Sequence, residues 1–227
     1  MKKSTLVTSI STLFAVTAFG VGCGGSNPVS TATPITITGP VANQKAVAGD
    51  TVLVTWTQSV ASPKLSYNYA DGTGWQQFAS VIAVDNNSAK AVLPTVSFSD
   101  SFQIKIEDNA GKYSAGVSAP FSVKYIVITS PAAGATLTNG STVNITWKYT
   151  PGKVSSLLLK LSTDGGKSYG VMLTVSVDPS LKSYAWVIGN EDGTGAPFSY
   201  PSTTCILKIS DYVSSQYFDA TGTFSVQ

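Results

Sequence analysis

The chain has 227 residues, of which 43% are hydrophobic and only 11% are charged, so it holds enough apolar material for packed cores. It contains neither His nor Arg, and all 14 basic residues are Lys. This excludes a His base for a Ser or Cys nucleophile, a His-based metal site and a guanidinium clamp for a carboxylate. The net charge of +2 equals the charge of Lys2 and Lys3 alone, which gives no electrostatic basis for binding nucleic acid.

The first 22 residues have the three parts of a secretory signal: a charged start, an apolar stretch and small residues before Cys23. The apolar stretch is short for a membrane span. The sequence GVGC resembles a bacterial lipobox, in which the chain is cut before the Cys and the thiol is acylated, although Gly20 stands where Leu is most usual. We therefore predict a signal peptide over residues 1–22 and a lipid anchor at Cys23. The alternative is an ordinary secretory signal followed by an unmodified Cys.

The next residues, 23–33, are rich in Gly, Ser, Thr and Pro, which is typical of a flexible tether. Gly24 follows the predicted lipidated Cys, where Asp would favour the inner membrane by analogy with the enterobacterial sorting rule. We therefore expect the protein in the cell envelope, held by its lipid at the outer membrane or the cell surface.

The rest of the chain contains two copies of one pattern. ITITGPVANQKAVAGDTVLVTWT at residues 35–57 aligns with IVITSPAAGATLTNGSTVNITWK at residues 126–148, with matched residues 91 positions apart. Further on, FQIKIED from Phe102 aligns with CILKISD from Cys205, 103 positions later. The second copy therefore holds about a dozen extra residues, most of them in GNEDGTGAPFSYP at residues 189–201.

Both copies alternate apolar and polar residues with the period of two that is typical of strands. Val52, Val54 and Trp56 form one such row, and the leucines at 157, 159 and 161 form another. Gly- and Asp-rich turn sequences separate the rows. The sequence thus predicts an all-β protein of two tandem Ig-like or fibronectin-III-like β-sandwiches, over residues 34–124 and 125–227.

As a set, these motifs resemble a known family. They run from Ile-x-Ile-Thr-x-Pro and the strand ending in Thr-Trp to STDGG, SYAWVI, PSTTCILKISD and a final FSV. The set is similar to the Ig-like domain of the KNH-like, Ser-Thr-rich GPI-anchored yeast cell-wall family, which bacterial surface proteins also carry in tandem. The resemblance is stronger over residues 126–227 than over 35–123. It implies an Ig-like fold at the cell surface and, in the yeast members, a link to wall glucan assembly; it implies no catalytic residues.

The segment STDGGKSY, residues 162–169, also resembles the Asp box of sialidase propellers. Sialidase chemistry depends on an Arg cluster, which this chain lacks, and a propeller needs about four blades or more, whereas only two repeats are present. The simpler interpretation is a β-hairpin turn. Asp164 then accepts hydrogen bonds from its own turn, while Gly165 and Gly166 adopt positive φ angles.

The chain has 12 carboxylates, and most lie in turn sequences, so no catalytic pair is predicted. Glu107 with Asp108, or Glu191 with Asp192, would be the candidates for Ca²⁺, which needs about six oxygen ligands. Neither pair lies in an EF-hand or RTX pattern. We predict no catalytic residue, no metal and no cofactor.

The position of each aromatic residue in the pattern of strands and turns predicts whether its side chain is buried or exposed. Three tryptophans lie on apolar strands and are expected in the cores: Trp56, Trp147 and Trp186. Cys205 is expected in a core for the same reason. A disulfide between Cys205 and Cys23, the only other Cys, would exclude lipidation of Cys23. Trp75 follows the turn sequence DGTG and is expected to be exposed. Together with three tyrosines it is a candidate platform for stacking sugar rings, against the alternative of scattered surface aromatics: Trp75, Tyr169, Tyr212 and Tyr217.

These features predict a non-enzymatic cell-surface lipoprotein with a structural or adhesive role at the envelope. Its expected partners are the membrane, through Cys23, and a polysaccharide or a surface protein, but not nucleic acid. One alternative is an accessory subunit of a carbohydrate-active enzyme complex, or a weak glycosidase. Another is a subunit of a surface filament or secretion apparatus, in which exposed sheet edges pair with another chain.

Overall fold

The computed structural model describes residues 32–189 and 201–227. The predicted signal peptide, Cys23, most of the tether, Glu191 and Asp192 lie outside these ranges. Residues 32–227 form one compact unit that contains every described strand and all of the described core. A chain that begins at Ala32 therefore keeps the complete described core. Within the described ranges, no helix has the length and apolar character needed to cross a membrane.

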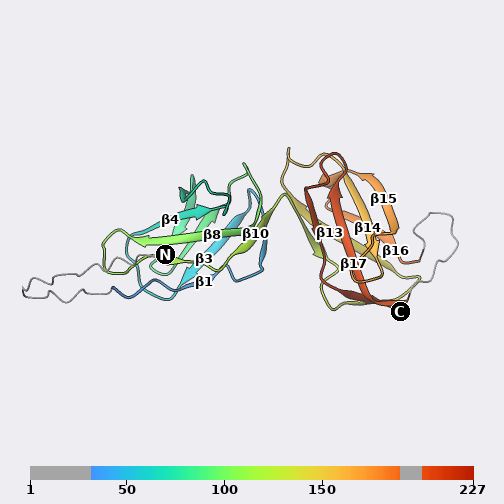
Figure 1. Ribbon diagram of the computed structural model, residues 1–227, viewed down its shortest axis with the longest axis horizontal. Helices are drawn as coiled ribbons and strands as arrows, with labels where there is room; N and C mark the ends of the chain where they lie inside the picture. Colours follow the sequence, from blue (N-terminus) through green and yellow to red (C-terminus); the bar gives the residue numbers. More distant parts are fainter. Residues whose placement is uncertain (1–31, 190–200) are drawn as a thin grey trace, which may run out of the picture. The chain divides into compact units, whose positions relative to one another are not determined.

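The first half of the chain folds into a sandwich of two sheets (Figure 1). One sheet has the strand order β1-β3-β7-β6, and the other has the order β2-β10-β8-β4-β5 with β9 paired to β8. All strand pairs are antiparallel except β2 with β10. The strands are β1 (Ile37–Gly39), β2 (Lys45–Val47), β3 (Thr51–Trp56), β4 (Pro63–Asn68), β5 (Gln76–Gln77), β6 (Val81–Val84), β7 (Ser88–Val92), β8 (Ser99–Asp108), β9 (Gly116–Val117) and β10 (Phe121–Lys124).

The second half repeats this topology, except that its described residues contain no counterpart of β6. Its sheets have the orders β11-β13-β16 and β12-β19-β17-β14-β15, with β18 paired to β17 and with β12 and β19 parallel. The predicted fold class, all-β with two tandem Ig-like sandwiches, is confirmed. The elements are β11 (Ile126–Ser130), β12 (Thr136–Leu137), β13 (Thr142–Tyr149), β14 (Leu157–Ser162), β15 (Val171–Val177), the 3-10 helix η1 (Pro179–Leu181), β16 (Ser183–Val187), β17 (Ser202–Asp211), β18 (Phe218–Ala220) and β19 (Phe224–Val226).

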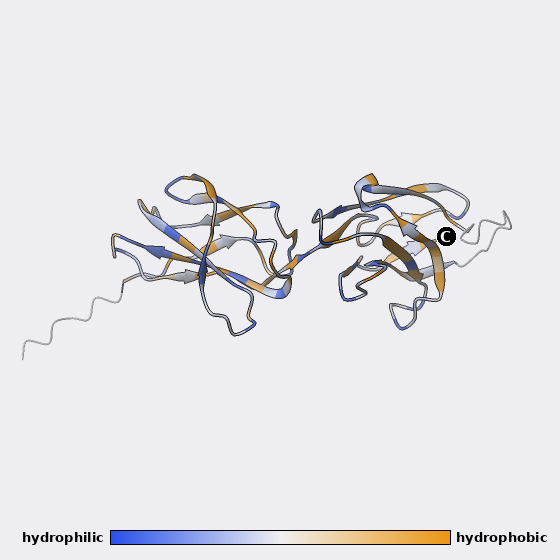
Figure 2. Cartoon of the chain, turned by 90° about the horizontal axis from the view of Figure 1, so that it is seen from above, coloured by the Kyte–Doolittle hydropathy of each residue, from blue (hydrophilic) through white to orange (hydrophobic). Residues whose placement is uncertain are grey.

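Alternation along the strands places the apolar residues between the two sheets of each sandwich, and Figure 2 shows the hydrophobic residues concentrated in the strands. Trp56 and Trp147 are 3% and 2% exposed, as predicted for core residues. Each indole N–H donates to a backbone carbonyl, that of Asn86 at 3.1 Å and that of Pro179 at 3.0 Å. Because a buried indole needs a hydrogen-bond partner, these bonds fix how each ring sits in its core.

Cys205 is fully buried in the core, as predicted, at the position matched to Phe102 in the first sandwich. Burial raises the pKa of its thiol, so the reactive thiolate is scarce. In a chain that begins at Ala32, it is the only thiol. We expect a thiol reagent at mildly alkaline pH to label the folded chain about 100-fold more slowly than the urea-unfolded chain, because labelling requires opening of the core. Equal rates would show that Cys205 is not a core residue.

Candidate functional site

The Asp164 turn joins β14 to β15 and is the β-hairpin turn that the sequence predicts. The Asp164 carboxylate accepts hydrogen bonds from the Ser162 hydroxyl at 2.7 Å and from the N–H and hydroxyl of Ser168 at 2.9 and 2.7 Å. These bonds, led by the one from the Ser168 hydroxyl, hold the pKa of Asp164 far below its usual range. Gly165 and Gly166 have φ angles of 74° and 87°. The motif is therefore a structural turn, and its carboxylate is fully engaged.

The other carboxylates of the described residues have similar structural uses. Asp108 accepts hydrogen bonds from the backbone of Ala110 and Lys112 in its own turn. Asp211 and Asp219 are buried, at 3% and 1% exposure, and are bonded to neighbouring N–H groups or to Lys45. The described part of the chain has no group of three or more Cys, Asp or Glu residues placed to hold a metal ion.

The four aromatic residues proposed as a stacking platform are divided between the two sandwiches, with Trp75 in the first and the three tyrosines in the second. Trp75 is 38% exposed in the first sandwich, and Tyr212 is 62% exposed just after β17. Tyr217 packs edge-on against Tyr125 and Phe98, with ring centroids 4.9 and 5.5 Å apart, so its ring is part of an aromatic cluster. Within the described ranges, no ring contact joins any two of the four: Trp75, Tyr169, Tyr212 and Tyr217.

An ordered turn between β4 and β5 holds Trp75. The Asp71 carboxylate accepts from the N–H and hydroxyl of Thr73 at 3.0 and 2.7 Å, and these bonds lower the pKa of Asp71. The Gln76 amide donates to the Thr73 hydroxyl, and its oxygen accepts from the hydroxyl of the buried Tyr67. This chain of bonds connects the turn to the core, so the indole of Trp75 is positioned before any ligand arrives.

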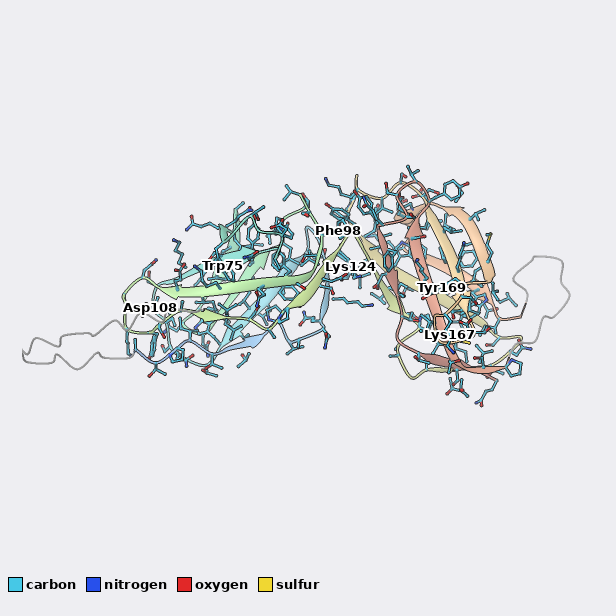
Figure 3. The ribbon with its side chains drawn as sticks, viewed as in Figure 1. Trp75, Phe98, Asp108, Lys124, Lys167 and Tyr169 are labelled. Carbon is cyan, nitrogen blue, oxygen red and sulfur yellow. The ribbon has the colours of Figure 1, made fainter. Side chains whose placement is uncertain are left out.

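Trp75 lies over the outward side of the sheet that contains β4 and β8 (Figure 3). We call this surface the Trp75 face and define it by five residues: Trp75, Ser66, Gln77, Lys105 and Glu107. The ammonium of Lys105 lies 5.2 Å from the centre of the Trp75 ring and 3.2 Å from the Glu107 carboxylate. Ser66 lies directly opposite both Lys105 and Gln77 in the strand register. Because opposite residues share one side of a sheet, these three side chains form a row next to the indole.

Ser66 has an unusual environment for an outward-facing serine. It is only 3% exposed, and its hydroxyl has no hydrogen-bond partner among the described residues. A buried hydroxyl without a partner costs about 1–3 kcal/mol, and because this one is covered, a ligand reaches it only if the side chains over it move. An exposed aromatic ring next to convergent polar groups is an arrangement suited to a sugar, which offers both C–H faces and hydroxyls.

The second sandwich has a related arrangement that sequence reasoning missed. Lys208 is the residue matched to Lys105, 103 positions later, and its ammonium lies 5.4 Å from the centre of the Tyr169 ring. Tyr169 follows the β14–β15 turn as Trp75 follows the β4–β5 turn (Figure 3). The signal was present in the aligned sequences FQIKIED and CILKISD, which both place a lysine on the outward side of a long strand. The aromatic partner of each lysine could not be found without the fold.

No protein-family model matches the chain, and no curated protein matches it. Among solved structures, it is similar to the fibronectin(III)-like modules of Clostridium thermocellum CbhA, with 16% identity over 85% of this chain and 91% of that chain and a TM-score of 0.26. It is also similar to the tandem Ig repeats of Dlar, with 11% identity over 86% and 97% and a TM-score of 0.26. At these identities and TM-scores no function can be transferred. The sheet topology of the chain itself makes it a tandem Ig-like β-sandwich protein.

Proposed function

We propose that this protein is a non-enzymatic, lipid-anchored protein of the cell envelope that binds polysaccharide through the Trp75 face. The observation that carries the binding role is the indole of Trp75, which is 38% exposed, follows an ordered turn and lies 5.2 Å from the Lys105 ammonium. A preorganised aromatic ring loses little conformational freedom on binding, which favours a flat, repeating ligand such as a sugar chain.

The absence of His and Arg supports a non-enzymatic role because the commonest general base and the anion clamp are both missing. The described aspartates near the Asp164 turn and in the cores are already bonded to their own structure. The lipobox-like GVGC and the resemblance to a cell-wall family support a position at the envelope. Anchoring at Cys23 is part of the proposal.

The test is native affinity electrophoresis of a chain comprising residues 32–227 in gels that contain different neutral wall polysaccharides. We expect one polymer to retard the protein selectively, and Trp75→Ala to weaken that retardation about tenfold or more, since a buried aromatic contact is commonly a hot spot. Tyr212→Ala is the matched control, because this ring is exposed but lies outside the Trp75 face.

Two results would refute the sugar-binding role: no retardation by any polymer, or equal retardation of the wild-type chain and Trp75→Ala. A spacer or a protein-binding role would then remain, and crosslinking on intact cells would identify the protein partner.

A further inference from the structure

The outward side of the second sandwich carries a row of residues that includes two lysines without a carboxylate partner among the described residues. In the register of β15, β14, β17 and β18, the row runs Met172, Lys160, Lys208, Ala220. The row faces outward because its neighbours along β14 and β17, among them Leu159 and Ile209, are fully buried. We call this surface the Tyr169 face and define it by five residues: Lys160, Lys208, Tyr169, Met172 and Phe218.

Lys160 and Lys208 are directly opposite each other on adjacent strands. Neither has a carboxylate within 4.0 Å among the described residues. Like charges that face each other across two strands are destabilising, so an anion placed between these two ammonium groups would remove a repulsion as well as form two charge-assisted bonds.

The first sandwich shows that the fold does not require this charge. There, the residue opposite the matched Lys105 is Ser66, and the lysine is paired with Glu107 at 3.2 Å. In the second sandwich Lys160 takes the place of Ser66, and Ser210 takes the place of Glu107, 103 positions later. Both differences make the second face more positive, so the two faces are suited to different ligands.

Apolar side chains border the lysine pair. Met172 is 51% exposed and Phe218 is 40% exposed, and the Lys208 ammonium lies 4.5 Å from the centre of the Phe218 ring. Lys124 also lies over Phe218, at 5.2 Å, but it is paired with Asp100 at 3.1 Å. These groups provide an uncharged surface on either side of the positive centre, against which the ring of a sugar can pack.

One carboxylate near this face, that of Asp164, makes its hydrogen bonds within its own turn. The Asp164 carboxylate is close enough to Tyr169 to add to the rise in the pKa of its hydroxyl, which burial mainly causes. That carboxylate is held by Ser162 and Ser168 in its own turn and is bonded to neither lysine. Lys167, exposed in the same turn, offsets the negative charge of Asp164 at this edge of the face.

We propose that the Tyr169 face binds an acidic polysaccharide, with a carboxylate or sulfate of the polymer held between Lys160 and Lys208. The proposal rests on the proposed function, for which it names a second polymer class. An acidic membrane surface is a poorer match, because electrostatic membrane binding uses clusters of about four to eight basic residues. Nucleic acid requires a larger basic surface than a chain with a net charge of +2 offers.

The experiment uses residues 32–227, so that a lipid at Cys23 cannot interfere, in affinity gels and calorimetry with three probes. The probes are polygalacturonate, neutral dextran, and vesicles of phosphatidylcholine with phosphatidylglycerol. We expect polygalacturonate to bind and dextran not to, with affinity that falls as salt is raised from low to physiological concentration. Lys160→Ser, which copies the first sandwich, should weaken polygalacturonate binding about tenfold, the loss expected for one charge-assisted contact.

Lys90→Gln, at an exposed lysine of β7 outside both faces, is the matched control and should leave polygalacturonate binding unchanged. Lys160→Ser should unfold at the same urea concentration as the wild-type chain or at a higher one, because it removes a repulsion. If Lys160→Ser does not fold, Lys208→Gln is the second variant, with the same expected loss of binding.

The inference is wrong if polygalacturonate does not bind, if both lysine variants bind it as the wild-type chain does, or if the lysines matter for vesicles alone. These results are separable from failure of the proposed function, which is read from the neutral-polymer gels with Trp75→Ala. Binding of neutral polymer without polygalacturonate would show that the Tyr169 face is misassigned, and the reverse result would show that the Trp75 face is misassigned.

Discussion

Replacing Trp147 by Ala is expected to lower the free energy of unfolding by about 3–5 kcal/mol, the range for removing a large aromatic residue from a core. Trp147 is 2% exposed on β13, where it lies opposite Ile128 in the strand register. The substitution leaves a cavity that the surrounding close-packed sheets fill only in part. It also leaves the carbonyl of Pro179 without the indole N–H at 3.0 Å. Urea unfolding followed by circular dichroism measures this loss.

Two further variants separate the causes of that loss. Trp147→Phe keeps most of the apolar volume but removes the hydrogen bond to Pro179, so it should cost about 1–2 kcal/mol. Trp75→Ala removes the same type of side chain from a partly exposed site and should cost about 1 kcal/mol or less. If Trp147→Ala proved no more destabilising than Trp75→Ala, Trp147 would not be a core anchor.

The fold could be predicted from the sequence because its signals are local and are repeated. A period of two in apolar residues decides which side of a strand is buried, and the matched residues Trp56 and Trp147 carry that pattern in both copies. The Asp164 turn was predictable for the same reason, since the hydrogen bonds to the Asp164 carboxylate come from residues 162 and 168 of the same turn. Cys205 could be placed in the core by its alignment with Phe102, and both are fully buried.

The candidate sites were only partly predictable, because they depend on which strands are neighbours. Exposure of Trp75 followed from its turn, but nothing local to Tyr217 shows that its ring packs against Phe98 and Tyr125, far away in the sequence. The pair of Lys160 and Lys208 is likewise set by the register between β14 and β17. A shift of one residue in that register would turn one of these lysines away, so the charge of this face is a property of the fold.

A second large effect is expected at Asp211, at the end of β17. One carboxylate oxygen accepts from the N–H groups of Ser155 and Ser156 at 3.0 and 3.2 Å, and the other accepts from the N–H of Ser214 at 2.7 Å. With 3% exposure, this side chain ties two loops to the edge of the core. Asp211→Ala leaves these N–H groups without their charged acceptor, and we expect a loss of about 2–4 kcal/mol in the free energy of unfolding.

Asp211→Asn gives the control for charge, because it has the same shape but replaces one acceptor oxygen by an amide donor. It should keep the bonds to Ser155 and Ser156, lose the bond to Ser214, and cost less than Asp211→Ala. Equal stability of Asp211→Ala and the wild-type chain would mean that water replaces these bonds without cost and that the loops are not tied at this point.

The same carboxylate should make the protein sensitive to acid. Burial by itself raises the pKa of Asp211, but the bonds from Ser155, Ser214 and Ser156 outweigh it, so the native pKa lies below the ordinary value of about 3.9. The unfolded chain therefore binds the proton more tightly than the native one. The stabilisation is complete above about pH 4 and is lost as the pH falls from there through the lowered native pKa.

Since other aspartates are also acid-sensitive, the measurement is the difference in urea-unfolding free energy between the wild-type chain and Asp211→Asn as a function of pH. We expect this difference to shrink on acidification, and a difference that stays constant down to the acid limit would show that the Asp211 charge does not stabilise the native loops.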